Sequence, residues 1–189
     1  MKQLLTLLCS LTISTAAFSQ KMPGLDKSPM DMTYYPNDFA HDRKFAPKQI
    51  GDMPAIVRVI YSRPAKKERE VFGGMVKYGN VWRTGANEAP EIKFYRDVTI
   101  KGNKVKAGTY ALYTIPNTDE WTIILSTDLD QWGAYSYSQD KDVLRVNVPV
   151  KMIDDVVENF TIQLIQSTGN EATMKLAWDQ TLVEVPIGF

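Results

Sequence analysis

The chain has 189 residues, and its 22 basic residues balance its 22 acidic ones, so the formal net charge at pH 7 is zero. Without a global positive field, neither nucleic acid nor an anionic membrane surface is an expected partner. Once an export leader is removed, the remaining length suits one domain that buries its own core without metal or disulfide support.

The first 20 residues have the pattern of an export signal. Lys2 is followed by an apolar run that ends in Ala-Phe-Ser, and cleavage is expected near Ser19 or Gln20. The run is too short for a membrane-spanning helix, and no later stretch approaches that length. The single cysteine, Cys9, lies inside the run, so the mature chain has no thiol for disulfides or metal ligation. We therefore expect an exported protein, periplasmic or extracellular.

Residues 21–54 are rich in proline, methionine, aspartate and tyrosine and show neither the helical nor the strand period. Each proline biases the residue before it away from helix, so we expect an extended, irregular arm laid over the domain. Tyr34, Tyr35 and Phe39 are its expected anchors. A disordered tether is the alternative for this segment.

From residue 55 onward, apolar and polar residues alternate with the period of β-strands. Strands are expected within residues 56–61, 91–95, 98–100, 110–115, 121–125, 144–148, 160–164, 172–178 and 181–187. Gly102-Asn103 indicates a short hairpin. Lys151 to Asn159 has a poor apolar stripe, and there we expect a loop or a single helical turn. The pattern predicts an all-β domain over residues 55–189, an antiparallel β-sandwich or jelly-roll-like barrel.

The stretch from residue 78 to residue 90 gathers an indole (Trp82), a guanidinium (Arg83), a carboxamide (Asn87) and a carboxylate (Glu88) between two predicted strands. An exposed indole would offer a flat face to a sugar ring or a cation, and its polar neighbours would orient a polyol or a carboxylate. Further ligand-binding surface is expected from residues elsewhere in the chain: Tyr61, Arg63, Trp132, Tyr135, Tyr137 and Arg145. The alternative is structural: Trp82 is a core residue, and Arg83 pairs with Glu88 to fix a long connection.

Metal and histidine chemistry have little support in the sequence. His41 is the only histidine, so neither a Ser-His-Asp triad nor a three-histidine zinc site is expected. Asp128 and Asp130 echo the start of a calcium loop, but Trp132 stands where a third ligand is wanted, which favours a solvated turn. We expect no metal and no cofactor.

Two other charged sets have open interpretations. Glycoside hydrolysis would pair Glu88 with a second acid, for which Glu91, Asp97 and Asp142 are candidates. The run from Lys66 to Glu70 is expected to be a solvated turn.

Long motifs in a fixed order carry a resemblance to a known family. They are L-D-K-S-P-M-D-M (25–32), V-I-Y-S-R-P (59–64), V-W-R-T-G-A-N-E-A (81–89), K-A-G-T-Y-A-L-Y-T-I-P (106–116), W-T-I-I-L (121–125), W-G-A-Y (132–135) and D-V-L-R-V-N-V-P (142–149). Over residues 25–187 the chain resembles exported bacterial proteins catalogued as domain of unknown function twenty-nine eleven. The resemblance implies the domain boundaries and export, and it implies no activity or catalytic residues.

Three function classes follow. The first is a non-catalytic binding module for a saccharide or small polar ligand, which uses the stretch from Trp82 to Glu88. The second is an envelope structural or interaction protein without a small-molecule site. The third is an acid/base hydrolase using Glu88, with Arg83 or Arg145 stabilising charge. We expect the first; the sequence sets no oligomeric state.

Overall fold

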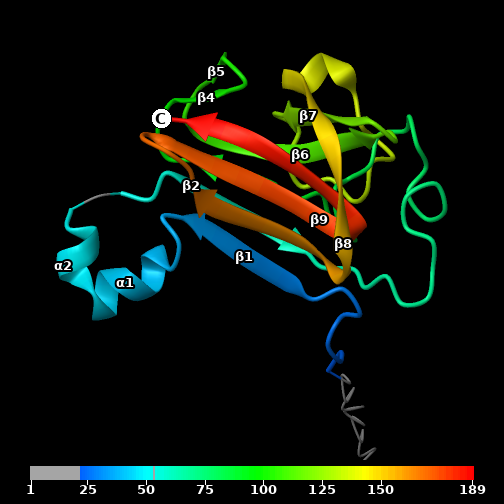
Figure 1. The fold of residues 1–189 in the computed structure, drawn as a ribbon, viewed down its shortest axis with the longest axis horizontal. Coiled ribbons are helices and arrows are strands. Elements are labelled where there is room, and N and C mark those ends of the chain that lie inside the picture. The colour runs from blue at the N-terminus through cyan, green and yellow to red at the C-terminus, as the bar shows by residue number, and fades with distance from the viewer. Residues whose placement is uncertain (1–21, 53) are drawn as a thin grey trace, which may run out of the picture.

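The computed structural model describes residues 22–52 and 54–189, so the expected export leader lies outside the described residues. Over these residues the chain is mostly antiparallel sheet (Figure 1). The strand order is β1-β2-β3-β6-β7-β8-β9-β4-β5. The all-β prediction is confirmed. Within the same residues, every helix is too short or too polar to cross a membrane.

The elements have the following bounds. The strands are β1 (Met30–Tyr35), β2 (Val57–Ser62), β3 (Glu91–Phe94), β4 (Val98–Ile100), β5 (Asn103–Val105), β6 (Gly108–Pro116), β7 (Glu120–Ser126), β8 (Asp142–Gln166) and β9 (Glu171–Gly188). Two short helices, α1 (Phe39–Phe45) and α2 (Pro47–Ile50), follow β1, and a 3₁₀ turn (Gln139–Lys141) precedes β8.

The sheet folds over itself into two layers because β8 is long enough to belong to both. Residues 142–149 of β8 pair with β7, and residues 150–166 pair with β9. As a result β1, at one end of the strand order, comes to lie beside β8 (Figure 1). The inward-facing side chains of both layers form one continuous hydrophobic core.

Alternation along the strands explains which side chains enter this core. In β9, alternate side chains from Ala172 to Trp178 are buried and the residues between them are only half-buried. Successive strand residues point to opposite faces, so a period of two buries one face of each strand. Burial of apolar surface stabilises the fold by about 25 cal/mol per Å².

The N-terminal arm is more regular than its composition predicts. β1 pairs with β2 in register from Met30↔Ser62 to Tyr35↔Val57, and α1 and α2 follow it. The prediction of an irregular arm is therefore wrong for residues 30–50. Two of the expected anchors, Tyr35 and Phe39, are buried, and Tyr34 packs beside Phe39. Residues 30–35 form a strand because they pair with β2, and their own sequence does not predict one.

The prediction of a loop or helical turn at residues 151–159 is also wrong. This stretch is part of β8, with register irregularities between Met152 and Val157 and between Val157 and Thr161. None of its side chains is fully buried. A bulged strand with neither face buried has no reason to alternate, which is why the strand period is missing here.

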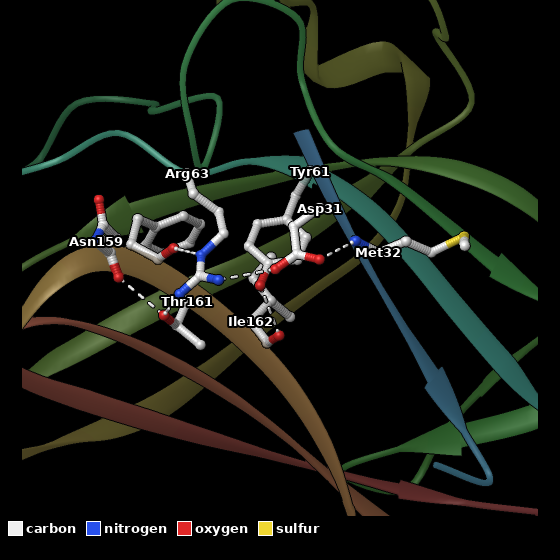
Figure 2. A network of polar contacts seen from close by, with 8 residues as sticks. Asp31, Met32, Tyr61, Arg63, Asn159, Thr161 and Ile162 are labelled. Carbon is white, nitrogen blue, oxygen red and sulfur yellow. Dashed lines mark hydrogen bonds and ion pairs between the residues drawn. The ribbon is translucent and has the colours of Figure 1, made fainter. Parts of the chain in front are cut away.

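The gap between β1 and β8, which we call the seam, is closed by side chains instead of a strand-to-strand ladder. The Arg63 guanidinium donates from Nε to the Phe160 carbonyl (3.2 Å), from Nη1 to Asp31 Oδ2 (2.9 Å) and from Nη2 to Thr161 Oγ1 (2.9 Å), as Figure 2 shows. The Tyr61 hydroxyl donates to the Ile162 carbonyl at 3.0 Å. These bonds satisfy carbonyl groups on an edge of β8 whose backbone pairing is limited to the segment after β2, where the Phe160 amide donates to the Pro64 carbonyl and the Lys66 amide donates to the Glu158 carbonyl.

Candidate functional site

The loop containing residues 81–89 is fixed to its surroundings by backbone hydrogen bonds. Trp82 and Thr114 of β6 exchange two such bonds, at 2.7 and 2.9 Å. The amide of Ala89 donates to the Gln131 carbonyl at 3.0 Å. Gly85 lies so close to β2 that a Cβ at this position would be 3.2 Å from the Ser62 carbonyl oxygen. The loop is therefore held between β2, β6 and the segment before β8.

Three non-glycine residues of this loop and of the turn opposite it have positive φ. Thr84 is buried and has φ of 59°, Asn87 has φ of 60°, and Lys67 has φ of 52°. A β-branched residue such as threonine rarely adopts positive φ. The Thr84 hydroxyl lies 3.3 Å from the Trp82 carbonyl oxygen and 3.1 Å from the Thr114 hydroxyl, contacts that hold this conformation. Such strain persists where the surroundings over-determine it, often at ligand sites.

Trp82 is a core residue, so the expectation of a solvent-displayed indole at this position is wrong. Only 8% of the residue is exposed, and its ring centroid lies 5.2 Å from Phe160 and 5.9 Å from Trp178. Its Nε1 donates to the Gly85 carbonyl at 3.2 Å. The aromatic cluster leaves no free indole face for a sugar ring to stack on.

A pocket of about 510 Å³ lies beside the buried indole, which we call the cationic pocket. It is lined by residues of the N-terminal arm, the turn after β2, the loop and β9: Lys27, Ser28, Pro64, Ala65, Lys67, Arg69, Met75, Val76, Trp82, Arg83, Gly85, Ala86, Asn87 and Trp178. Its size falls in the range of small-molecule sites, about 300–1,000 Å³. Apolar side chains and two tryptophans form part of the wall, and most of the polar side chains in it are cations.

Four cationic residues line the pocket and no carboxylate does: Lys27, Lys67, Arg69 and Arg83. Across the residues that the structure describes, none of the four forms an ion pair. Two of the Arg69 nitrogens are occupied by the carbonyls of Lys66 and Ala65, at 3.1 and 2.6 Å. Clustered cations that form no ion pair repel one another, and an anion bound among them would relieve that repulsion.

Arg83 is the most confined of these cations. Its Nε is buried and has no hydrogen-bond partner among the described residues. Burial lowers its pKa below the ordinary arginine value, because desolvation penalises the charged form, while Tyr135 acts in the opposite direction. The alternative pairing of Arg83 with Glu88 is absent from the described structure. A desolvated guanidinium without a partner is well suited to bind a carboxylate, sulfate or phosphate group.

Acidic groups do lie near the pocket, and each has a partner of its own. Asp26 Oδ1 accepts from the Asn87 side-chain amide at 3.1 Å and from the Ser28 amide at 2.7 Å. Glu158 Oε1 accepts from the Lys67 backbone amide at 2.7 Å. The partner of Asp179 is Lys66, at 2.9 Å. These contacts connect the arm to the loop and the turn to β8, and none of them is an ion pair with one of the four pocket cations.

The other predicted ligand residues lie outside the cationic pocket. Tyr61 and Arg63 belong to the seam, where their donors are used within the fold. Glu88 and Trp132 face each other across an isolated antiparallel bridge, and both are exposed. The structure thus brings together only Trp82, Arg83 and Asn87 of the predicted set.

Arg145 belongs to a separate polar cluster at the start of β8. Its Nη1 donates to Asp142 Oδ2 (2.8 Å) and to the Tyr137 hydroxyl (2.7 Å), and Tyr137 in turn donates to Asp142 Oδ2 at 2.5 Å. Burial, reinforced by the hydrogen bond to Asp142, raises the pKa of Tyr137 to about 12. This arrangement fixes the connection between residues 127 and 142 to the outer face of the sheet.

The structure does not support the expected hydrolase site, because two of the acids considered as partners for Glu88 are used in other contacts. Of the acids considered as partners for Glu88, Asp97 accepts from Lys106 Nζ (2.8 Å) and the Ala107 amide (2.9 Å), and Asp142 is held by Tyr137 and Arg145. In the described part of the chain, no group of three or more histidine, cysteine, aspartate or glutamate side chains is arranged to hold a metal ion. His41 is exposed on α1 beside Asp42.

The residues that sequence reasoning missed are the cations contributed by other segments. Lys67 and Arg69 fall in the run expected to be a solvated turn, and Lys27 falls in the arm. No local sequence pattern identifies these three residues as site residues. They share only the property that they line one pocket, and that property appears only in the folded chain. The motif positions 25–32, 59–64 and 81–89 each contribute to its wall, which is a signal visible only after folding.

Comparison with known proteins gives one match. A family model described as "Protein of unknown function (DUF2911)" matches residues 46–187. No curated protein and no solved structure is significantly similar to the chain.

Proposed function

The chain belongs to the DUF2911 family, and since that description assigns no activity, we propose from the geometry that the protein is an exported, non-catalytic binding module for a small polar ligand that carries a negative charge. The ligand occupies the cationic pocket. The proposal rests on one observation: four cations line this pocket and none has a carboxylate partner in the described structure.

The composition of the pocket wall favours a charged ligand over a neutral one. Arg83 and Arg69 offer N–H donors, and Lys27 and Lys67 add point charges at the rim. Arginine binds carboxylate and phosphate groups through two parallel hydrogen bonds, whereas lysine contributes charge without fixed geometry. Of the two expected ligand classes, a saccharide or a small polar molecule, this set of donors favours the second, including sugars that bear an acid group.

The rest of the wall sets the shape of the ligand. Val76, Met75 and Pro64 supply apolar surface, and Trp82 and Trp178 also line the pocket. Both indole N–H groups are already bonded within the fold, to the carbonyls of Gly85 and Glu158. The indoles therefore offer contact surface without new hydrogen bonds, and the ligand body facing them is apolar.

Isothermal titration of the purified protein tests the proposal with a matched panel. The anionic probes are glucuronate, glucose 6-phosphate, citrate, inorganic phosphate and sulfate, and glucose is the neutral match. We expect binding of an anionic probe that weakens as salt rises, because screening acts on the attraction between partly exposed charges. Glucose binds much more weakly, because it has no charge to offer the cations.

A pair of double variants separates the pocket from general charge. Lys27→Gln/Lys67→Gln removes two pocket cations whose side chains make no hydrogen bond with the described residues. We expect Kd to rise about tenfold or more, which corresponds to at least about 1.4 kcal/mol. The control, Lys48→Gln/Lys104→Gln, removes the same charge from exposed positions on α2 and β5 and leaves Kd unchanged.

Each contrary result points to one of the other function classes. If no anionic probe binds, the binding proposal fails and a structural or interaction role is favoured. Equal affinities for glucose and glucuronate would refute the role given to the cations. Equal losses in the two double variants would show that net charge, and not the pocket, attracts the ligand.

A further inference from the structure

The segment from Thr127 to Ser138 exposes two aromatic side chains although it is anchored at several points. The Thr127 amide donates to the Lys141 carbonyl at 2.9 Å and so closes the loop. Leu129, Ala134 and Tyr137 pack against a cluster on the outer face of β6 and β7: Ala111, Tyr113 and Ile124. Between these anchors, Trp132 is 61% exposed and Tyr135 is 87% exposed.

Backbone contacts fix the positions of the two residues that carry these rings. Trp132 bridges to Glu88, and the Gly133 amide donates to the Asn87 carbonyl at 2.9 Å. Gly133 has φ of 69°, a conformation that glycine adopts without steric cost. A Cβ there would lie 2.8 Å from the Tyr135 ring, so the ring packs directly on the glycine backbone. We call Trp132 and Tyr135 the aromatic platform.

From this arrangement we infer that the aromatic platform is a second binding site, and that its ligand is a saccharide whose sugar rings stack on the exposed ring of Trp132 and on that of Tyr135. Indole and phenol rings have an apolar face and a polar tip, and a pyranose likewise combines an apolar C–H face with hydroxyl groups. The exposed Glu88 carboxylate beside Trp132 makes no hydrogen bond with the described residues and can accept from those hydroxyls.

The size of the platform favours a saccharide over a protein partner. A stable protein interface buries about 800 Å² on each partner. Two aromatic side chains would supply roughly 150–250 Å² each even if they were covered completely, which is well short of that area. The loop packs its other apolar residues, Leu129, Ala134 and Tyr137, against the sheet, where they are half-buried.

This site adjoins the proposed anion site, because Tyr135 acts electrostatically on Arg83, but the two sites have separate side chains. Neither Trp132 nor Tyr135 lines the cationic pocket. Trp132→Ala, which changes the ring that does not act on Arg83, should therefore leave anion binding intact, and Lys27→Gln/Lys67→Gln should leave saccharide binding intact. The failure of one proposal would not imply the failure of the other.

Retention on insoluble polysaccharides tests the platform. Purified protein is mixed with chitin, cellulose and peptidoglycan, and bound and free fractions are measured over a range of polysaccharide concentrations. We expect the wild type to be retained on at least one of them. Trp132→Ala and Tyr135→Ala each reduce the affinity about tenfold or more, while Trp132→Phe keeps most of it because a flat apolar face remains.

Controls keep the test decisive. Phe45→Ala removes an exposed ring from α1 and should be retained like the wild type. Circular dichroism of the platform variants should match that of the wild type, because both side chains point to solvent. The inference is overturned if the wild type binds none of the three polysaccharides, or if Trp132→Ala binds as the wild type does.

Discussion

Two arginines, Arg63 at the seam and Arg83 at the cationic pocket, are used in opposite ways. Arg63 donates from all three nitrogens, to one carboxylate, one carbonyl and one hydroxyl, and so connects β1, β2 and β8. Arg83 is also partly buried, yet its Nε has no partner among the described residues. A satisfied arginine stabilises the fold, whereas an unsatisfied one beside a pocket is available to a ligand. The comparison separates structural cations from binding cations.

The largest expected effect is at the seam. Arg63→Gln removes donors from Asp31, Thr161 and the Phe160 carbonyl, and the shorter amide cannot reach all three. Hydrogen bonds to charged groups contribute about 1.5–3 kcal/mol, so we expect the free energy of unfolding to fall by about 2 kcal/mol. Urea denaturation measures it. If the free energy of unfolding falls no more than it does in Arg83→Gln, the two arginines do not differ in their contribution to stability and the comparison fails.

A smaller effect is expected at the other satisfied arginine, Arg145, through its partner Tyr137. Tyr137→Phe removes the hydrogen bond to Asp142 and should lower the free energy of unfolding by about 1 kcal/mol at neutral pH. The folded-state pKa of about 12 exceeds the ordinary value of 10.0, so this contribution is complete below pH 10 and disappears as pH rises toward 12. Unfolding curves measured at several pH values should show that the free energies of unfolding of the variant and the wild type converge between pH 10 and pH 12.

The smallest expected effect is at the pocket. Arg83→Gln removes a buried donor that has no partner in the described structure, and loss of such a group is close to neutral. We expect the free energy of unfolding to change by less than about 0.5 kcal/mol, while affinity for the anionic probe falls. Urea denaturation and titration are run on the same sample. Strong destabilisation would show that Arg83 supports the fold, as Arg63 does.

The fold was accessible from the sequence wherever one face of a strand is buried. Alternation near Ile92, Ile123 and Leu176 identified strands that the structure contains, because burial of one face imposes a period of two. At residues 151–159 the strand bends with bulges and buries neither face, so that period is lost. β1 was missed because its order comes from pairing with β2.

The candidate site was only partly accessible. Trp82 and Trp132 both lie in turn-prone segments, and their local sequences do not distinguish a core indole from an exposed one. Trp82 is buried because Phe72, Phe160 and Trp178 surround it, and Trp132 is exposed because its own neighbours anchor the loop. Which of two indoles is covered depends on contacts between segments far apart in the chain.

The sequence by itself determined the all-β class and marked the stretch around Arg83 as a candidate site, because both depend on the local residue pattern and composition. Tertiary structure decided which charges are paired. Lys27, Lys67 and Arg83 are separated by long stretches of chain, and they line one pocket only because β1 docks on β2 and the turn after β2 lies opposite the loop. Charge pairing depends on distance in space, and that distance is set when the sheet folds over on itself.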